Sequence, residues 1–172
     1  AGTHAAVRGV ELYRAAVTRD PSFATAWLGL AYASRSKFVF APELAEQATR
    51  DIAEAADRIA ALAPDWWAAH MVRAWIDFGR DLVAQHRSLE RVLELAPGLP
   101  LELLRTLVPF YAKVNDPRAL ELARLAGRND PLSLLWSGIY QVLLHVAGRE
   151  DEVEQEYRRS LSLAGDREMT EH

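Results

Sequence analysis

Apolar residues recur along the chain with the spacing of three or four residues that is typical of amphipathic helices. Near the N-terminus, Val10, Tyr13 and Val17 would share one face of a helix. Near the C-terminus, Tyr157 and Leu161 would do the same. The pattern predicts a chain made largely of helices, each of which buries one face.

Proline and glycine divide this helical pattern at regular intervals. The dividing residues are Pro21, Pro64, Pro97, Pro131 and Gly165, at separations of 43, 33, 34 and 34 residues. Proline marks a boundary because it cannot donate the amide hydrogen bond that would continue the preceding helix. A period near 34 residues predicts stacked helix hairpins rather than a globular fold around a pocket.

The dividing residues also set the expected elements. We expect a lone helix near residues 3–19, hairpins at residues 22–63, 65–96, 100–128 and 132–164, and a frayed C-terminal segment at 166–172. The residues five positions before each dividing residue are small or aliphatic, as close packing of helices requires. They are Ala16, Ile59, Val92, Ala126 and Ser160.

The first hairpin is nine residues longer than the usual unit, which would extend its helices by about 2.5 turns. Its tip carries Phe38, Val39 and Phe40, which either form an exposed patch for a ligand or pack on the extra turns. The adjacent Trp66 and Trp67 also allow a structural or a ligand-binding interpretation. Trp66 is expected to fill the core between units, and Trp67 either packs at the start of a helix or is exposed.

Two segments resemble a known repeat family. The segment from Gly148 to Gly165, GREDEVEQEYRRSLSLAG, has the turn glycine, aromatic residue, small residue and closing turn of the second helix of a tetratricopeptide unit. The segment from Tyr13 to Tyr32, YRAAVTRDPSFATAWLGLAY, resembles the junction between two such units. The likeness spans nearly all 172 residues. It implies an all-α fold, a right-handed α-solenoid of stacked antiparallel helix hairpins with about nine helices.

The enlarged first hairpin and the segment Asn129–Leu134 further resemble tetratricopeptide arrays that are joined to bacterial regulators. These regulators include winged-helix transcription factors, adenylate cyclases and serine/threonine kinases. The resemblance implies a non-catalytic interaction or scaffold module that serves as the sensing or assembly part of a larger regulatory protein.

In such arrays the first helix of each hairpin lines the concave face, so the resemblance implies a peptide- or protein-binding surface there. The expected surface residues are Leu28, Tyr32, Arg35, Met71, Trp75, Phe78, Val108 and Gln141. Tyr, Trp, Met and Arg are suited to this role because side chains of this kind contribute much of the binding energy at protein interfaces. The alternative interpretation assigns Trp75 and Phe78 to the core between helices.

Composition narrows the function further. The chain has 20 Lys and Arg against 24 Asp and Glu, a formal charge of −4, which argues against nucleic-acid binding. It has no cysteine, which excludes disulfides, thiol catalysis and cysteine-ligated zinc. No run of about 18 apolar residues occurs, so we expect no membrane insertion. A cytoplasmic location is favoured, and an extracytoplasmic one is open if a transmembrane helix lies upstream.

No catalytic motif of the zinc-protease, phosphate-loop or serine-hydrolase type occurs in the sequence. We therefore expect no enzymatic activity, no cofactor and no metal. The alternative is a helical-repeat enzyme or a small-ligand domain that uses the carboxylates Asp51, Glu54 and Asp57 or the histidines His70 and His86. We expect the carboxylates to form a solvated helix face and the histidines to lie between helices.

The first helix has no partner before it, so the side that carries Val7 and Val10 would be left uncovered. Terminal repeats need a cap, which another helix, a neighbouring domain or a second copy would supply. Association through this end, as a homo-oligomer, is therefore a prediction.

Overall fold

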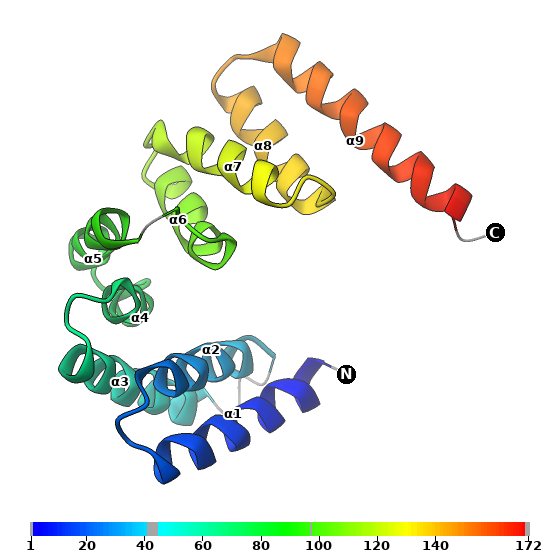
Figure 1. The fold of residues 1–172 in the computed structure, drawn as a ribbon. Helices are drawn as coiled ribbons and strands as arrows, with labels where there is room; N and C mark the ends of the chain where they lie inside the picture. The colour runs from blue at the N-terminus through cyan, green and yellow to red at the C-terminus, as the bar shows by residue number, and fades with distance from the viewer. Residues whose placement is uncertain (1, 41–44, 97, 171–172) are drawn as a thin grey trace. The chain divides into compact units, whose positions relative to one another are not determined.

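The structure is a computed structural model that describes residues 2–40, 45–96 and 98–170, with side chains described for 7–36, 45–96 and 98–163. Nine α-helices make up most of the described chain, and no strand occurs among those residues (Figure 1). The helices are α1 Gly2–Arg19, α2 Ala24–Phe40, α3 Ala45–Leu62, α4 Trp67–Asp77, α5 Leu82–Leu95, α6 Leu101–Lys113, α7 Arg118–Asn129, α8 Leu134–Val146 and α9 Glu150–Thr170.

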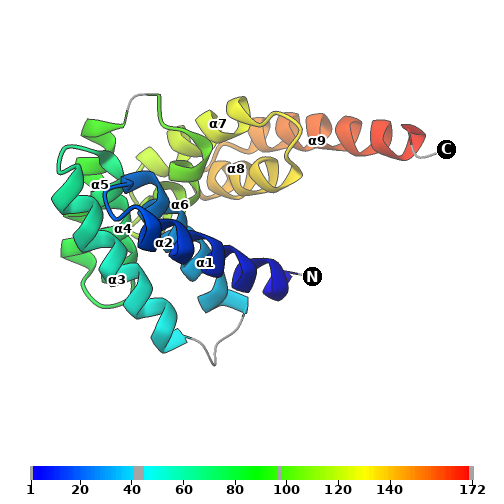
Figure 2. The same cartoon turned by 60° about the horizontal axis from the view of Figure 1, so that its bottom comes forward.

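The chain divides into two compact units, Ala1–Pro97 and Gly98–His172, which we call unit 1 and unit 2. Unit 1 holds α1 to α5, and unit 2 holds α6 to α9. Within each unit, every helix packs against the next helix in the sequence. Figure 2 shows this succession from a second direction. The predicted all-α architecture of successive helix hairpins is confirmed.

The added length of the first hairpin lies in its helices. Helices α2 and α3 have 17 and 18 residues, whereas α4 has 11. The side chains of Phe38, Val39 and Phe40 lie outside the described residues, as does the connection 41–44. The rings of Trp66 and Trp67 meet edge to face at 5.6 Å between centroids, and both pack against the core of unit 1. Packing is therefore the better interpretation of this tryptophan pair.

The prediction of a helix end at Gly165 was wrong. Helix α9 continues through Gly165 to Thr170, so no separate segment begins at residue 166. A glycine inside a helix costs only about 1 kcal/mol relative to alanine, and no proline follows it to stop the helix. Gly148 does act as a turn glycine. Its φ is 70°, and its N–H donates to the carbonyl of His145 at 2.9 Å, which closes α8.

The lone first helix is covered on the side that was expected to be bare. Val10 is only 6% exposed and belongs, with Val17, to the core cluster of unit 1. Helix α1 packs against α2, which is the reason for this burial. The outward side of α1 carries Leu12 instead, at 57% exposure.

A buried carboxylate joins the first three helices. Asp51 of α3 is 1% exposed and accepts hydrogen bonds from Arg14 of α1, from the hydroxyl of Ser34 at 3.2 Å and from the amide of Gln47 at 2.6 Å. The prediction that Asp51 lies on a solvated helix face was wrong. Its oxygen atoms satisfy buried or partly buried donors, and such a carboxylate is costly to remove because the donors lose their acceptor.

We predict that Asp51→Ala lowers the free energy of unfolding by about 1–3 kcal/mol, since the buried hydroxyl of Ser34 is left without its acceptor. Urea unfolding followed by circular dichroism measures the change. The matched control is Glu54→Ala, an exposed carboxylate on the same helix, which should change stability by less than about 0.5 kcal/mol. Equal effects of the two substitutions would show that the Asp51 network contributes nothing.

Helices α1 and α2 approach each other closely at a glycine. A Cβ atom placed on Gly29 would lie 2.2 Å from an atom of the Tyr13 ring, so the ring occupies the space above this glycine. At Gly9, on the other helix of the pair, the nearest atom is the Cβ of Ala33 at 3.4 Å. Of these two glycines, only Gly29 has no room for a Cβ atom while the Tyr13 ring keeps its position.

We predict opposite effects for two alanine substitutions. Gly9→Ala should stabilise the protein by up to about 1 kcal/mol, because alanine favours a helix over glycine. Gly29→Ala should destabilise it by about 1–3 kcal/mol, because the Tyr13 ring must leave its place. Thermal unfolding tests both variants. A rise in Tm for Gly29→Ala that equals the rise for Gly9→Ala would contradict the role of the Tyr13 contact.

Candidate functional site

The eight residues predicted to line a binding surface belong to two units. Leu28, Tyr32, Arg35, Met71, Trp75 and Phe78 lie in unit 1, and Val108 and Gln141 lie in unit 2. Unit 1 therefore carries six of the eight expected surface residues, and unit 2 carries two.

Three of the eight residues contribute to packing instead of to an open surface. Met71 is fully buried, Val108 is 1% exposed and Leu28 is 8% exposed. Helices α2 and α4 each pack against more than one neighbour, so more of their circumference is covered than a single concave face would imply. The expected surface in unit 1 is therefore reduced to Tyr32, Arg35, Trp75 and Phe78.

These four residues, which we call the aromatic cluster, lie on α2 and at α4. The rings of Tyr32 and Trp75 meet edge to face, with centroids 4.8 Å apart and planes at 72°. The guanidinium carbon of Arg35 lies 4.8 Å from the centroid of the Trp75 ring. Phe78 follows the last residue of α4 and is 66% exposed. Edge-to-face ring pairs and cation–π contacts are both favourable and hold their members in defined positions.

The two residues that the alternative interpretation assigns to the core between helices differ in their environment. Trp75 packs against the core cluster of unit 1 while it also contacts Arg35, so it has a structural role. Phe78 is mostly exposed and is not part of the core. Burial lowers the pKa of the Arg35 guanidinium, and the proximity of Tyr32 offsets part of this. Arginine keeps its charge at neutral pH, so the cluster presents a partly desolvated cation beside aromatic rings.

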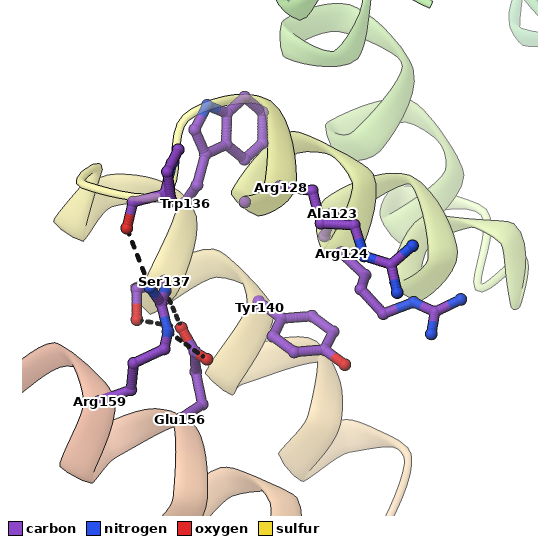
Figure 3. A pocket seen from close by; sticks show the side chains of 10 residues that line it. Ala123, Arg124, Arg128, Trp136, Ser137, Tyr140, Glu156 and Arg159 are labelled. Carbon is purple, nitrogen blue, oxygen red and sulfur yellow. Dashed lines mark hydrogen bonds and ion pairs between the residues drawn. The ribbon is translucent and has the colours of Figure 1, made fainter. Parts of the chain in front are cut away.

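Gln141 leads to a second feature, a pocket in unit 2 that sequence reasoning missed. The amide of Gln141 donates to the hydroxyl of Ser137 at 3.2 Å, and this hydroxyl donates to Glu156 at 2.6 Å. The pocket has a volume of about 420 Å³ and lies at α7, α8 and α9 (Figure 3). It is lined by Ala123, Arg124, Gly127, Arg128, Pro131, Trp136, Ser137, Tyr140, Glu156 and Arg159.

An ion pair forms one wall of this pocket. Arg159 donates to both carboxylate oxygens of Glu156, at 2.9 and 2.5 Å, and also to the carbonyl of Pro131 at 2.9 Å. Burial acts to raise the pKa of Glu156, but the hydrogen bonds from Arg159 and Ser137 outweigh it and hold the pKa below its ordinary value. Glu156 is therefore ionised at neutral pH, and the pair is neutral as a whole.

The carboxylates and histidines of the alternative enzymatic interpretation do not come together. Asp51 is occupied by the donors that join α1, α2 and α3. His86 contacts Glu90 at 2.8 Å, and burial, helped by Arg91, lowers the pKa of His70. Among the residues that the structure describes, no group of three or more potential ligands is arranged to hold a metal ion. No helix of the described ranges has the length and apolar character needed to cross a membrane.

Comparison with known proteins identifies the fold. No protein-family model and no curated protein matches this chain. Two solved structures, described as "Crystal structure of MamA" and "Crystal structure of MamA protein", do resemble it. The match to the first has a TM-score of 0.64 at 15% sequence identity and covers 93% of this chain and 89% of the MamA chain. The second has a TM-score of 0.62 at 16% identity and covers 95% and 85%. MamA is a tetratricopeptide-repeat protein, and the chain accordingly has a tetratricopeptide-like fold.

Proposed function

We propose that this protein is a non-catalytic interaction module that binds a peptide or protein segment through the aromatic cluster of unit 1. The tetratricopeptide-like fold is consistent with a scaffold for protein interactions. The observation that carries the proposal is the contact of Tyr32 and Arg35, both on α2, with the Trp75 ring on α4. The cluster offers a cation and an aromatic ring in contact with the Trp75 ring, and an exposed phenyl ring directly after the end of α4.

The chemistry of the cluster suits a segment that contains an apolar and an acidic side chain. Phe78, at 66% exposure, offers apolar area that a partner would cover. Arg35 offers donors in a fixed orientation, because its guanidinium already lies over the Trp75 ring. A surface whose side chains are already held in place loses little conformational entropy on binding, which favours affinity.

The enlarged first hairpin supports a further part of the proposal, that the module senses or assembles partners within a larger bacterial regulatory protein. Helix α2 carries two residues of the aromatic cluster and is 17 residues long. Helix α3, the second helix of the same hairpin, is 18 residues long.

We predict that Phe78→Ser and Arg35→Gln each weaken the binding of partner peptides by about tenfold or more, as truncation of a major contact residue does. The peptides are selected from a random phage-displayed library on the wild-type chain. Their affinities are then measured by fluorescence anisotropy. Trp75→Ala and Tyr32→Ala should also weaken binding, and circular dichroism must show that these two variants remain folded because Trp75 packs against the core.

The matched control is Phe23→Ser, which removes another exposed phenyl ring of unit 1, at 51% exposure, from a position before α2. This variant should bind the selected peptides as the wild type does. Unchanged affinity in Phe78→Ser and Arg35→Gln, with folded proteins, would reject the aromatic cluster as the binding surface.

A further inference from the structure

The pocket in unit 2 has an apolar floor beneath the side chains of α7. Trp136, at 2% exposure, forms part of this floor. Gly127 lies in α7 at the edge of the pocket, and a Cβ atom placed on it would meet nothing within 4 Å. No close contact therefore requires a glycine there, although glycine weakens a helix. A side chain at this position would have open space around it at the pocket.

The wall formed by α9 offers no net charge to a ligand. Arg159 is bound on both sides, by Glu156 and by the carbonyl of Pro131, and Ser137 donates its hydroxyl proton to Glu156. Hydrogen bonds of this kind between opposite charges fix the side chains in place. The ion pair is therefore a rigid, neutral wall.

The rim formed by α7 is cationic. Arg124 and Arg128 are four residues apart, so they lie on the same face of the helix, and both are exposed. Figure 3 shows their guanidinium groups extending to the same side as the hydroxyl of Tyr140. Arg124 is paired with Glu121 at 2.5 Å. The side chain of Arg128 has no ion pair or hydrogen bond within the part of the chain whose side chains are described. Two arginines at this spacing repel each other, so an anion that binds between them would relieve the repulsion.

We propose that this pocket is a second binding site, which takes a short acidic segment of a protein partner. An apolar side chain of the segment enters over Gly127 and Trp136, and a neighbouring Asp or Glu carboxylate binds Arg128, with Arg124 beside it. The volume of about 420 Å³ lies in the range of sites that hold small ligands. A nucleic acid fits less well, because the floor is apolar and offers no further cations for a chain of phosphates. The site rests on the proposed function only in taking a peptide, since it lies in the other unit.

The test uses the whole chain and a defined probe, the blocked peptide acetyl-Gly-Glu-Leu-Glu-Leu-Gly-amide. Its control has Gln in place of both Glu residues. In ¹⁵N-resolved NMR spectra we expect saturable shifts of the Gly127 amide, the Trp136 indole and the Arg128 side chain with the acidic peptide. The Gln peptide should bind at least about tenfold more weakly, because charge-assisted hydrogen bonds to arginine are lost. Equal binding of both peptides, or no saturable shift with either, would overturn the proposal.

A leucine substitution at each of two glycines distinguishes filling of the pocket from a general effect on a helix. Gly127→Leu should fill the pocket and abolish binding of the acidic peptide. Gly138→Leu places the same side chain on α8, at another glycine whose Cβ would meet nothing within 4 Å and which does not line the pocket. This control should bind normally. Wild-type binding by Gly127→Leu would overturn the proposal.

The exposed Arg128 gives a test that does not depend on the fold of the leucine variant. Arg128→Gln should weaken the binding of the acidic peptide by about tenfold and leave the binding of the Gln peptide unchanged. Binding of the acidic peptide that is unaffected by this substitution would overturn the site. The same spectra are recorded with a six-residue deoxythymidine oligonucleotide. Saturable shifts with the oligonucleotide but not with the acidic peptide would also overturn the proposal. Phe78→Ser should leave peptide binding in unit 2 intact, so failure of one site is distinguishable from failure of the other.

Discussion

Close packing of small and aliphatic side chains between successive helices is the interaction on which the rest of this structure depends. An amphipathic helix cannot remain with its apolar stripe in water, and in each unit the next helix in sequence covers that stripe. Ala31, Ala48 and Ala55 are fully buried in unit 1, and Ala123 and Ala126 are fully buried in unit 2. Side chains of this size allow the helix backbones to approach closely. Each candidate site combines buried or partly buried residues of this packing, such as Trp75 and Trp136, with exposed residues at its edge, such as Phe78 and Arg128.

Much of the architecture could be predicted from the sequence, because it depends on local signals. Proline and turn glycines set the helix ends, and the residues five positions before three of the predicted ends, Ile59, Val92 and Ala126, are fully buried, as expected. The predictions failed for residue types that occur in two environments, namely glycine at helix ends or inside helices and aspartate on the surface or buried. Gly165 lies inside α9, and Asp51 is a buried acceptor. Nothing in the spacing of an isolated carboxylate shows that donors on two other helices will surround it.

The candidate surfaces were predictable only as far as the periodicity of a helix allows. Spacing places Tyr32, Trp75 and Phe78 on first helices of hairpins, but it does not show which side chains the neighbouring helices cover. Met71 and Val108 share that spacing and are buried. The pocket of unit 2 had a weak signal in the sequence, the paired Arg124 and Arg128 around Gly127. It could not be recognised because the opposite wall comes from α9, about 30 residues later.

The order in which the helices pack has a consequence for how the protein forms. Since helices that are neighbours in the sequence are also neighbours in space within each unit, chain segments need to close only short loops to reach their final contacts. Contact order is low in such a topology, which favours rapid acquisition of the native state, and helices are free to assemble one at a time. Damage at one helix pair is then transmitted mainly to the adjoining pair, so an array of this kind can acquire new surfaces in one hairpin while the others stay intact.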